Sequence, residues 1–178
     1  MKKSFVLAIC LLCSAAVNAA SVDFNPPLKI VNVGDSFSID LSGRSFADVL
    51  DGGGLDLDFD PAIVHVTAVT IDPLWEVSPN LGTIDNVGGH VSNIQFNTLS
   101  SNPTGDFFIG SIQFSAVGIG SSSLILREDL ANPFASEGFP LAVTLNSGTV
   151  QAVPEVSAAW MMVIGLGVFG VARKMRRV

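Results

Sequence analysis

Apolar and polar residues alternate one by one through the middle of the chain, and this alternation restricts the fold more than any other feature. Between residues 36 and 41, and again between 55 and 60, a serine or aspartate separates each apolar residue from the next. Successive side chains of a β-strand point to opposite faces, so each such segment buries one face and exposes the other. The apolar residues in this pattern are Phe37, Ile39, Leu41, Leu55, Leu57, Phe59, Ile94, Phe96, Phe108, Ile112, Phe114, Leu124, Leu126, Leu141, Val143 and Leu145.

Glycine- and proline-containing turns separate these runs and set the predicted topology. Examples are residues 33–35, 51–54, 102–105 and 118–120. Between the two ends of the chain no stretch of ten residues shows a helical apolar stripe, and residues 72–90 and 127–140 are expected to be the longest loops. Eight or nine short strands joined by turns predict an all-β fold, an antiparallel β-sandwich built as one domain over residues 20–152.

The first nineteen residues have the pattern of a secretory signal peptide. Lys2 and Lys3 precede an apolar run, and small residues precede a predicted cleavage after Ala19. Cys10 and Cys13, the two cysteines of the chain, lie within this segment. The exported domain is therefore predicted to contain no disulfide, no thiol nucleophile and no zinc–thiolate site. Signal peptidase is the expected processing partner at this end.

The last twenty-six residues, 153–178, form a separate unit with three parts. Val153, Pro154 and Glu155 come first, and an apolar run over residues 156–172 follows. A helix of that length reaches roughly 25 Å, slightly less than the hydrocarbon core of a bilayer. A basic cluster then ends the chain, and the positive-inside rule makes it a cytoplasmic stop. We therefore predict a transmembrane helix over residues 156–172, with a stop formed by Arg173, Lys174, Arg176 and Arg177.

This order of motif, apolar helix and basic end resembles the PEP-CTERM sorting signal of exported proteins in Gram-negative bacteria. In that family a Val-Pro-Glu-Pro-like motif precedes the helix, and the membrane enzyme exosortase is thought to cut there. Val153, Pro154 and Glu155 match the motif, whereas Val156 stands in place of the second proline. The resemblance implies an inner-membrane-anchored precursor that is sorted by exosortase to the cell surface or an extracellular polysaccharide matrix.

The charge of the predicted domain is far more acidic than that of the whole chain. The whole chain has a net charge of −7. Six of its nine cations lie in the two ends, so residues 20–152 contain three cations against fifteen acidic residues, a net charge of −12. Such a surface repels phosphate backbones, and we therefore expect no nucleic-acid partner.

Three segments of the middle region resemble cohesin domains. KIVNVGDSFSIDL (residues 29–41) is similar to the opening of a cohesin, where a Val-Gly-Asp turn precedes the second strand. GLDLDFDPAIV (54–64) resembles the strand that ends in an aromatic-Asp-Pro turn, and IGSIQFSA (109–116) resembles a later strand. The implied fold is a nine-stranded jelly-roll sandwich, which some carbohydrate-binding modules share. In cellulosomes cohesins bind dockerins through one flat face, and the dockerin holds the calcium.

Asp56, Asp58 and Asp60 form the sharpest electrostatic pattern, and we considered them as a calcium site. Alternate residues on one strand are about 6.6 Å apart, whereas calcium needs oxygens at about 2.3–2.6 Å. The three carboxylates therefore do not converge on one ion from a regular strand. The expectation is a solvated face and no cofactor, with calcium as the weaker alternative.

The domain offers little for catalysis. The domain contains two histidines. His65 is expected to point to the same side of its strand as Val69 and to be packed or at the rim of the sandwich. His90 is expected to lie in a turn. No Gly-x-Ser-x-Gly nucleophile elbow is present. Glu76, Glu128 and Glu137 fall in the predicted loops. We therefore expect no enzyme, and a secreted hydrolase is the least favoured alternative.

Trp75 is the one candidate ligand contact. Sugar-binding sandwiches stack rings on exposed Trp or Tyr, and residues 20–152 contain this single tryptophan and no tyrosine. A loop tryptophan that covers one end of the sandwich is the favoured alternative. The sequence thus predicts an exported, non-catalytic binding or scaffolding domain with a dockerin-like protein or a polysaccharide as ligand. A carbohydrate-binding module of the same fold is the main alternative.

Overall fold

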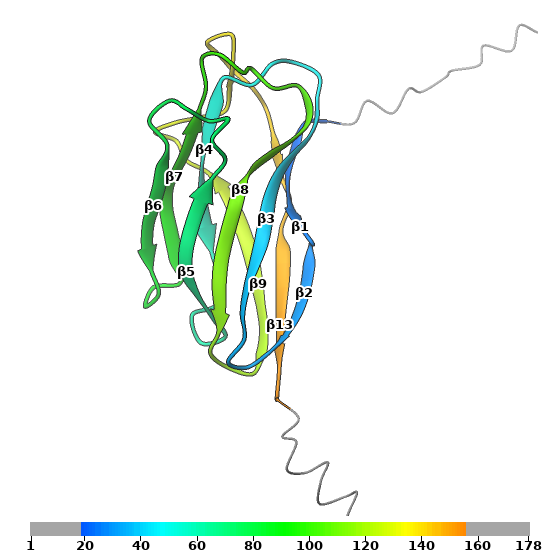
Figure 1. Ribbon diagram of the computed structural model, residues 1–178, viewed down its shortest axis with the longest axis vertical. Helices are drawn as coiled ribbons and strands as arrows, with labels where there is room; N and C mark the ends of the chain where they lie inside the picture. The colour runs from blue at the N-terminus through cyan, green and yellow to red at the C-terminus, as the bar shows by residue number, and fades with distance from the viewer. Residues whose placement is uncertain (1–18, 156–178) are drawn as a thin grey trace, which may run out of the picture.

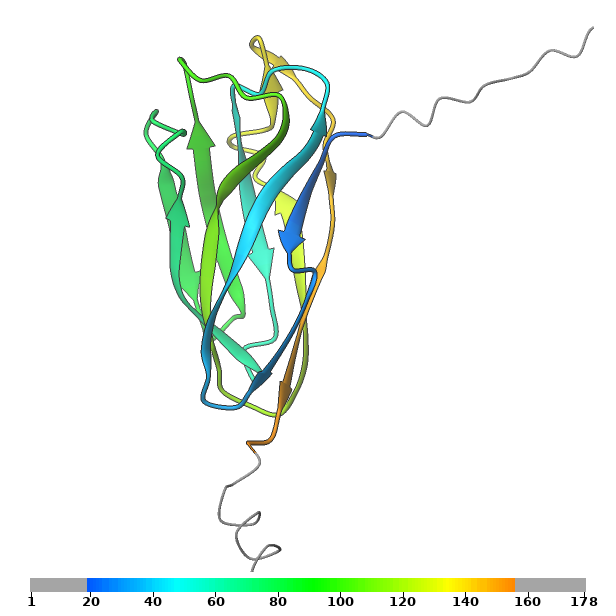
Figure 2. The ribbon, with the colours of Figure 1, turned by 45° about the vertical axis from the view of Figure 1, so that its right-hand side comes forward.

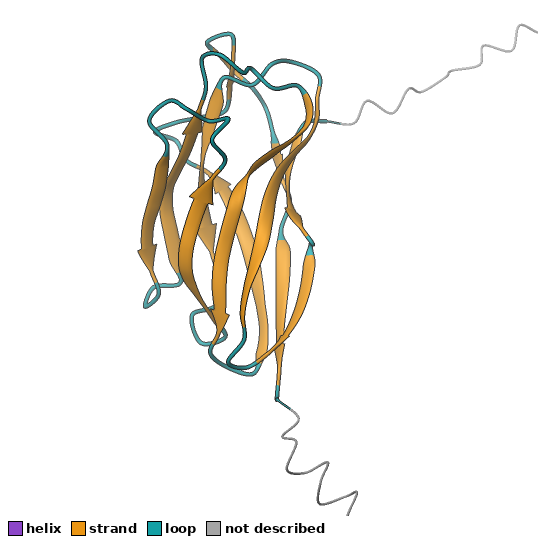
Figure 3. Ribbon diagram, viewed as in Figure 1, coloured by secondary structure: helices purple, strands orange, loops and turns teal. Residues whose placement is uncertain are grey.

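The computed structural model describes residues 19–155, which form two β-sheets packed face to face (Figure 1). All regular elements in this part of the chain are strands (Figure 3). The strands are β1 (Ser21–Asn25), β2 (Leu28–Asn32), β3 (Ser36–Phe46), β4 (Gly52–Asp58), β5 (Val64–Ile71), β6 (Asn80–Asp85), β7 (His90–Asn97), β8 (Gly105–Ala116), β9 (Gly120–Glu128), β10 (Ala135–Ser136), β11 (Phe139–Pro140), β12 (Thr144–Leu145) and β13 (Gly148–Val153). The predicted all-β sandwich is confirmed.

The first sheet has the strand order β12-β1-β3-β8-β5. The second has β11-β10-β4-β9-β13-β2, and β7 pairs with β4 and carries β6 at its outer edge. The predicted antiparallel arrangement holds for most pairs but is wrong for two. β1 pairs in parallel with β12, and β2 pairs in parallel with β13. Both exceptions join the beginning of the domain to its end.

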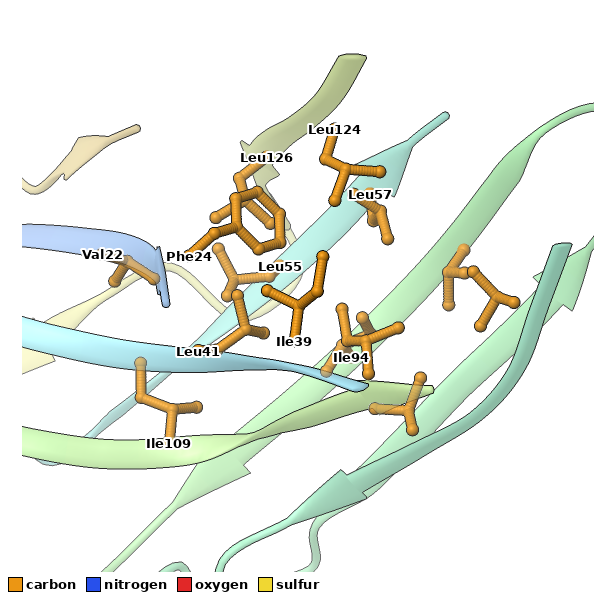
Figure 4. Close-up of a cluster of buried hydrophobic side chains, with 14 of the residues drawn as sticks. Val22, Phe24, Ile39, Leu41, Leu55, Leu57, Ile94, Ile109, Leu124 and Leu126 are labelled. Carbon is orange, nitrogen blue, oxygen red and sulfur yellow. The ribbon is translucent and has the colours of Figure 1, made fainter. Parts of the chain in front are cut away.

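The core lies between the two sheets, where the alternating apolar residues meet (Figure 4). Ile39 and Leu41 of β3 point inward from one sheet, and Leu55 and Leu57 of β4 point inward from the other. Their polar neighbours lie on the outer faces, as expected for half-buried strands. Burial of these side chains provides the main stabilisation of the sandwich.

A β-bulge in β8 reverses the predicted orientation of Phe108. Leu41 pairs with Gly110, but the next residue, Ser42, pairs with Phe108, so Ile109 is an extra residue in the ladder. Ile109 is completely buried, whereas Phe108 is 41 % exposed. The prediction that Phe108 faces the core is therefore wrong.

The predicted loop over residues 72–90 contains a strand. β6 occupies Asn80–Asp85 and pairs with β7 as an edge strand. Nearly all of its residues are exposed, so it has no buried face and leaves no alternation in the sequence.

Residues 52–54, expected to form a turn, are instead the start of β4. A Cβ on Gly53 would lie 2.7 Å from the Phe134 ring, and one on Gly54 would lie 2.8 Å from Cβ of Asp129. The glycines therefore allow the segment after β9 to pack directly on β4.

Several predictions fall outside the described residues. They are the signal-peptide residues 1–18, the helix over residues 156–172, and the stop formed by Arg173, Lys174, Arg176 and Arg177. Between residues 19 and 155, no helix is long and apolar enough to cross a membrane. Val153 is the last residue of β13, and the adjoining Pro154 and Glu155 are exposed and lie outside any strand.

Candidate binding face

The outer face of β7, β4 and β9 carries the densest group of charged side chains that share hydrogen bonds. These three strands are neighbours in the second sheet. Asp58 of β4 pairs with His90 of β7 on one side and with Ile125 of β9 on the other. Asp56 pairs with Arg127 in the same way. Because directly paired residues share a face, all five side chains lie on the outside of this sheet.

Asp58 is the centre of this group. Its Oδ1 lies 2.7 Å from Nδ1 of His90, and its Oδ2 forms an ion pair with Nη2 of Arg127. The imidazole of His90 and the guanidinium of Arg127 thus contact the same carboxylate from the two neighbouring strands. Asp58 and His90 are partly buried at the sheet surface, and Arg127 is largely exposed. The arrangement leaves Arg127 accessible to a partner while Asp58 holds its position.

The three aspartates predicted as a weak calcium site have separate roles. Asp56 Oδ1 accepts a hydrogen bond from the backbone N–H of Asn93 at 2.9 Å. Asp60 Oδ1 accepts one from the N–H of Ala62, which closes the turn after β4. Among residues 19–155, no group of three or more histidine, aspartate or glutamate side chains is arranged to hold a metal ion. The three carboxylates therefore contact three different partners: the backbone of Asn93, the side chain of His90 and the backbone of Ala62.

A shallow hollow lies beside Asp58 on the same face. It runs along the end of β4 and the first half of β9, and Ile125 is 41 % exposed next to it. The residues that line it are Asp58, Phe59, Asp60, Ser121, Ser123 and Ile125. Small hydroxyls, an apolar side chain and a charged pair therefore lie within one patch. We refer to Asp56, Asp58, His90, Ile125 and Arg127, together with this hollow, as the β4–β9 face.

The outer side of the first sheet has a different composition. Ser38, Ser111, Gln113 and Ser115 project from β3 and β8, and Thr70 Oγ1 lies 2.7 Å from Ser111 Oγ. His65 is on this side, opposite Ser115. A second bulge, at Val66–Ala68, places Val69 in the core, so the predicted shared orientation of His65 and Val69 is wrong.

Two of the three carboxylates considered for catalysis, Glu76 and Glu128, accept hydrogen bonds from backbone N–H groups, and Glu137 is exposed. Glu76 Oε1 accepts hydrogen bonds from the backbone N–H groups of Leu99 and Ser100 and from Oγ of Ser100. The bond from the N–H of Leu99 contributes most to lowering the pKa of Glu76 from 4.5 to about 2, followed by bonds from the backbone of Glu76 itself and from the side chains of Thr98 and Ser100. A general acid needs a raised pKa, so Glu76 is unsuited to that role. Glu128 accepts a bond from the N–H of Phe134, and His90 lies in β7, outside the predicted turn.

Trp75 is buried and offers no ring face to solvent. It is 1 % exposed, and its Nε1 donates a hydrogen bond to the carbonyl of Phe108 at 3.2 Å. The ring makes edge contacts with Phe96 and Phe107. Its use as a ligand contact is therefore not supported, and the carbohydrate-binding alternative loses its one aromatic platform.

Comparison with known proteins identifies the fold. No protein-family profile and no curated protein matches the sequence. Solved cohesin structures match the fold at low sequence identity. One is a type I cohesin–dockerin complex from Clostridium thermocellum, with a TM-score of 0.63, 11 % identity, and coverage of 76 % of this chain and 100 % of that chain.

Two further structures extend the likeness. The third cohesin of ScaC from Acetivibrio cellulolyticus, in complex with a dockerin, gives a TM-score of 0.60 at 16 % identity and covers 75 % and 99 % of the two chains. A non-cellulosomal cohesin from the archaeon Archaeoglobus fulgidus gives 0.59 at 14 % identity and covers 81 % and 98 %. Residues 19–155 therefore form a cohesin-like β-sandwich.

The sequence analysis missed the association between Asp58, His90 and Arg127. These residues are separated by at least thirty positions in the chain and meet only because β4 pairs with both β7 and β9. The alternating aspartates marked the outer side of β4, but no local signal identified the neighbouring strands.

Proposed function

We propose that this chain is an exported, non-catalytic binding domain that holds a protein partner on its β4–β9 face. The observation that carries the proposal is the cohesin-like sandwich, because several solved structures of this fold are cohesins in complex with dockerins. A dockerin-like segment of another protein is the corresponding partner here. The domain then acts as an attachment point.

The β4–β9 face suits this role better than the outer side of the first sheet. It combines an exposed Ile125, a hollow and the accessible cation of Arg127. Protein interfaces place apolar contacts at the centre and polar or charged groups at the rim, with arginine enriched. The first sheet also carries the exposed Phe108 and the Arg44–Asp106 ion pair, but these lie at the first half of β8. Its own hollow lies at the second half of β8 and is lined by Ser36, Phe37, Ser38, Thr67, Gln113 and Phe114, so apolar contact, hollow and charge pair are not combined in one patch there.

Export and sorting complete the proposal. Signal peptidase acts after Ala19, and exosortase acts on Val153, Pro154 and Glu155 while residues 156–172 cross the inner membrane. The sorted domain then lies at the cell surface or in the exopolysaccharide matrix. Mass spectrometry of the mature protein tests this step, and a C-terminus near Val153–Val156 is the expected result. A mature species that still carries Arg176 and Arg177 would instead mean a permanent anchor.

The binding role can be tested with two matched surface variants of the full chain. The probes are dockerin-bearing proteins encoded in the same genome, and their affinities are measured by isothermal titration. Ile125→Lys introduces a charge at the centre of the β4–β9 face and is expected to weaken binding by about tenfold or more. Gln113→Lys makes the same change on the other sheet and is expected to leave the affinity unchanged.

Three results would contradict the proposed function. Equal affinity of the wild-type and Ile125→Lys proteins would exclude the β4–β9 face. Retention on polysaccharides, with no binding to any dockerin-bearing protein, would instead make the domain a carbohydrate-binding module. Failure to bind either probe would remove the dockerin-like partner.

A further inference from the structure

Three large apolar side chains protrude from the loops at one end of the sandwich. Leu99 is 81 % exposed, Leu130 is 89 % exposed and Phe139 is 74 % exposed. They come from three separate segments: the β7–β8 loop, the segment after β9, and β11. Exposed apolar side chains that gather in one region are typical of interaction sites.

Hydrogen bonds through Asp51 hold two of these segments together. The backbone N–H of Thr98 donates to the carbonyl of Asp51 at 2.8 Å, next to Leu99. The N–H of Gly138 donates to Asp51 Oδ2 at 2.8 Å, next to Phe139. Leu99 and Phe139 are therefore each one residue from an anchor on the same aspartate.

The segment that carries Leu130 is tied to the same end of the sandwich. Nδ2 of Asn132 donates to Oδ1 of Asn97 at 3.2 Å, two residues before Leu99. Asp129, which precedes Leu130, is buried and accepts a bond from Nε2 of Gln95. The three apolar residues thus protrude from a hydrogen-bonded framework, so a partner meets a largely preformed surface.

The surroundings of these side chains are acidic. The segments 47–51, 72–79, 98–104 and 129–143 contain no lysine, arginine or histidine. They contain six acids, namely Asp48, Asp51, Asp72, Glu76, Asp129 and Glu137. Asp48, Glu76 and Glu137 are exposed. The backbone bond from Leu99 to Glu76 also keeps the pKa of Glu76 near 2, so this carboxylate is charged at neutral pH.

This loop end lies opposite the end at which β13 finishes. In Figures 1 and 2 the loops after β7 and β9 are at the top of the sandwich, and the end of β13 is at the bottom. An attachment through residue 153 therefore leaves the loop end facing away from the point of attachment.

We propose that the loop end, defined by Leu99, Leu130 and Phe139 with Asp48, Glu76 and Glu137, is a second docking surface for a cationic, amphipathic protein segment. The three exposed apolar side chains would pack against apolar groups of the partner. The acidic rim favours a partner that carries lysine or arginine next to those apolar groups. Surfaces that carry phosphate are repelled by the same rim. The surface is separate from the β4–β9 face.

Short synthetic peptides of lysine and leucine, patterned as an amphipathic helix, are the probe. They are titrated against the full chain in mild detergent, and hydrogen exchange locates the contact. The lysine–leucine peptide is expected to protect the segments around Leu99, Leu130 and Phe139. A glutamate–leucine peptide is expected not to bind, and a lysine–serine peptide is expected to bind about tenfold more weakly.

Matched variants complete the test. The triple substitution Leu99→Ser, Leu130→Ser and Phe139→Ser is expected to weaken binding of the lysine–leucine peptide by about tenfold. Val87→Ser with Ile119→Ser removes exposed apolar side chains from loops at the other end, and is expected to have no effect. Ile125→Lys is likewise expected to have no effect, which separates this surface from the proposed dockerin-like site.

Equal affinity for the lysine–serine peptide, or an unchanged affinity of the triple variant, would overturn the proposal. Protection of the three segments by detergent alone would also overturn it, because the surface would then bind lipid-like molecules. Thermal melts that match the wild type exclude misfolding of the variants.

Discussion

Trp75 packs at one end of the core, where its ring joins residues from both sheets. Phe96 belongs to β7 of the second sheet and Phe107 to β8 of the first, and the Trp75 ring contacts both. Trp75→Ala is expected to lower the free energy of unfolding by about 3–5 kcal/mol, as large aromatic truncations do in protein cores. Denaturant unfolding measures the loss.

Trp75→Phe is the control for the Trp75 prediction. It keeps an aromatic ring but removes the hydrogen bond to Phe108, so its cost is expected to be smaller. A Trp75→Ala protein as stable as the wild type would show that the side chain does not contribute to the core.

Glu76 makes the stability of the loop end depend on pH. Its pKa of about 2 in the folded protein lies below the ordinary 4.5, so the ionised form stabilises the fold. This contribution is complete above pH 4.5 and is lost as the pH falls towards 2. Glu76→Gln is expected to be less stable than the wild type at neutral pH, with the difference disappearing in acid. Thermal melts across this pH range measure it.

Ser101→Ala is a matched control for Glu76, because it alters the same loop without removing a titrating group. Its difference from the wild type should not change with pH. Parallel melting curves of the wild type and Glu76→Gln over the whole range would contradict the assigned pKa.

At the scale of the strand, the bulge in β8 can be tested with two neighbouring substitutions. Ile109→Ala removes a completely buried side chain and is expected to cost about 2–5 kcal/mol of unfolding free energy. Phe108→Ala removes a side chain that is partly exposed, so its cost is expected to be clearly smaller. A regular strand predicts the opposite order, so a larger cost for Phe108→Ala would exclude the bulge.

The strands that could be predicted from the sequence are those with one buried and one exposed face. β3 and β4 are examples, because core packing imposes the alternation on them. β6 could not be predicted, since an exposed edge strand places no such demand on its sequence. The bulge at Ile109 also left no signal, because phenylalanine and isoleucine are equally acceptable as buried residues.

The candidate site was predictable only in part. The aspartates of β4 indicated a solvated face, and the structure places them on the outer side of the sheet. Which strands lie beside β4 depends on pairing between distant segments, and periodicity does not encode that pairing. Trp75 is a second example, because the sequence around a loop tryptophan does not show whether the ring packs on the core or binds a ligand.

At the scale of the whole molecule, the beginning and end of the domain are joined in both sheets. β1 pairs with β12 in the first sheet, and β2 pairs with β13 in the second. One continuous cluster of buried side chains connects the sheets. We therefore expect one cooperative unfolding transition, with far-UV circular dichroism and tryptophan fluorescence changing together. Two separated transitions would show that the sheets unfold independently.

The position of β13 has a mechanical consequence. This strand lies between β9 and β2, and residue 153 is its last residue. Force applied to residue 153 along the strand axis puts the hydrogen bonds to both β9 and β2 under shear simultaneously. Bonds loaded together in shear resist force better than bonds that open one after another. A domain pulled through residue 153 would therefore transmit tension into the second sheet at a strand that is hydrogen-bonded on both sides.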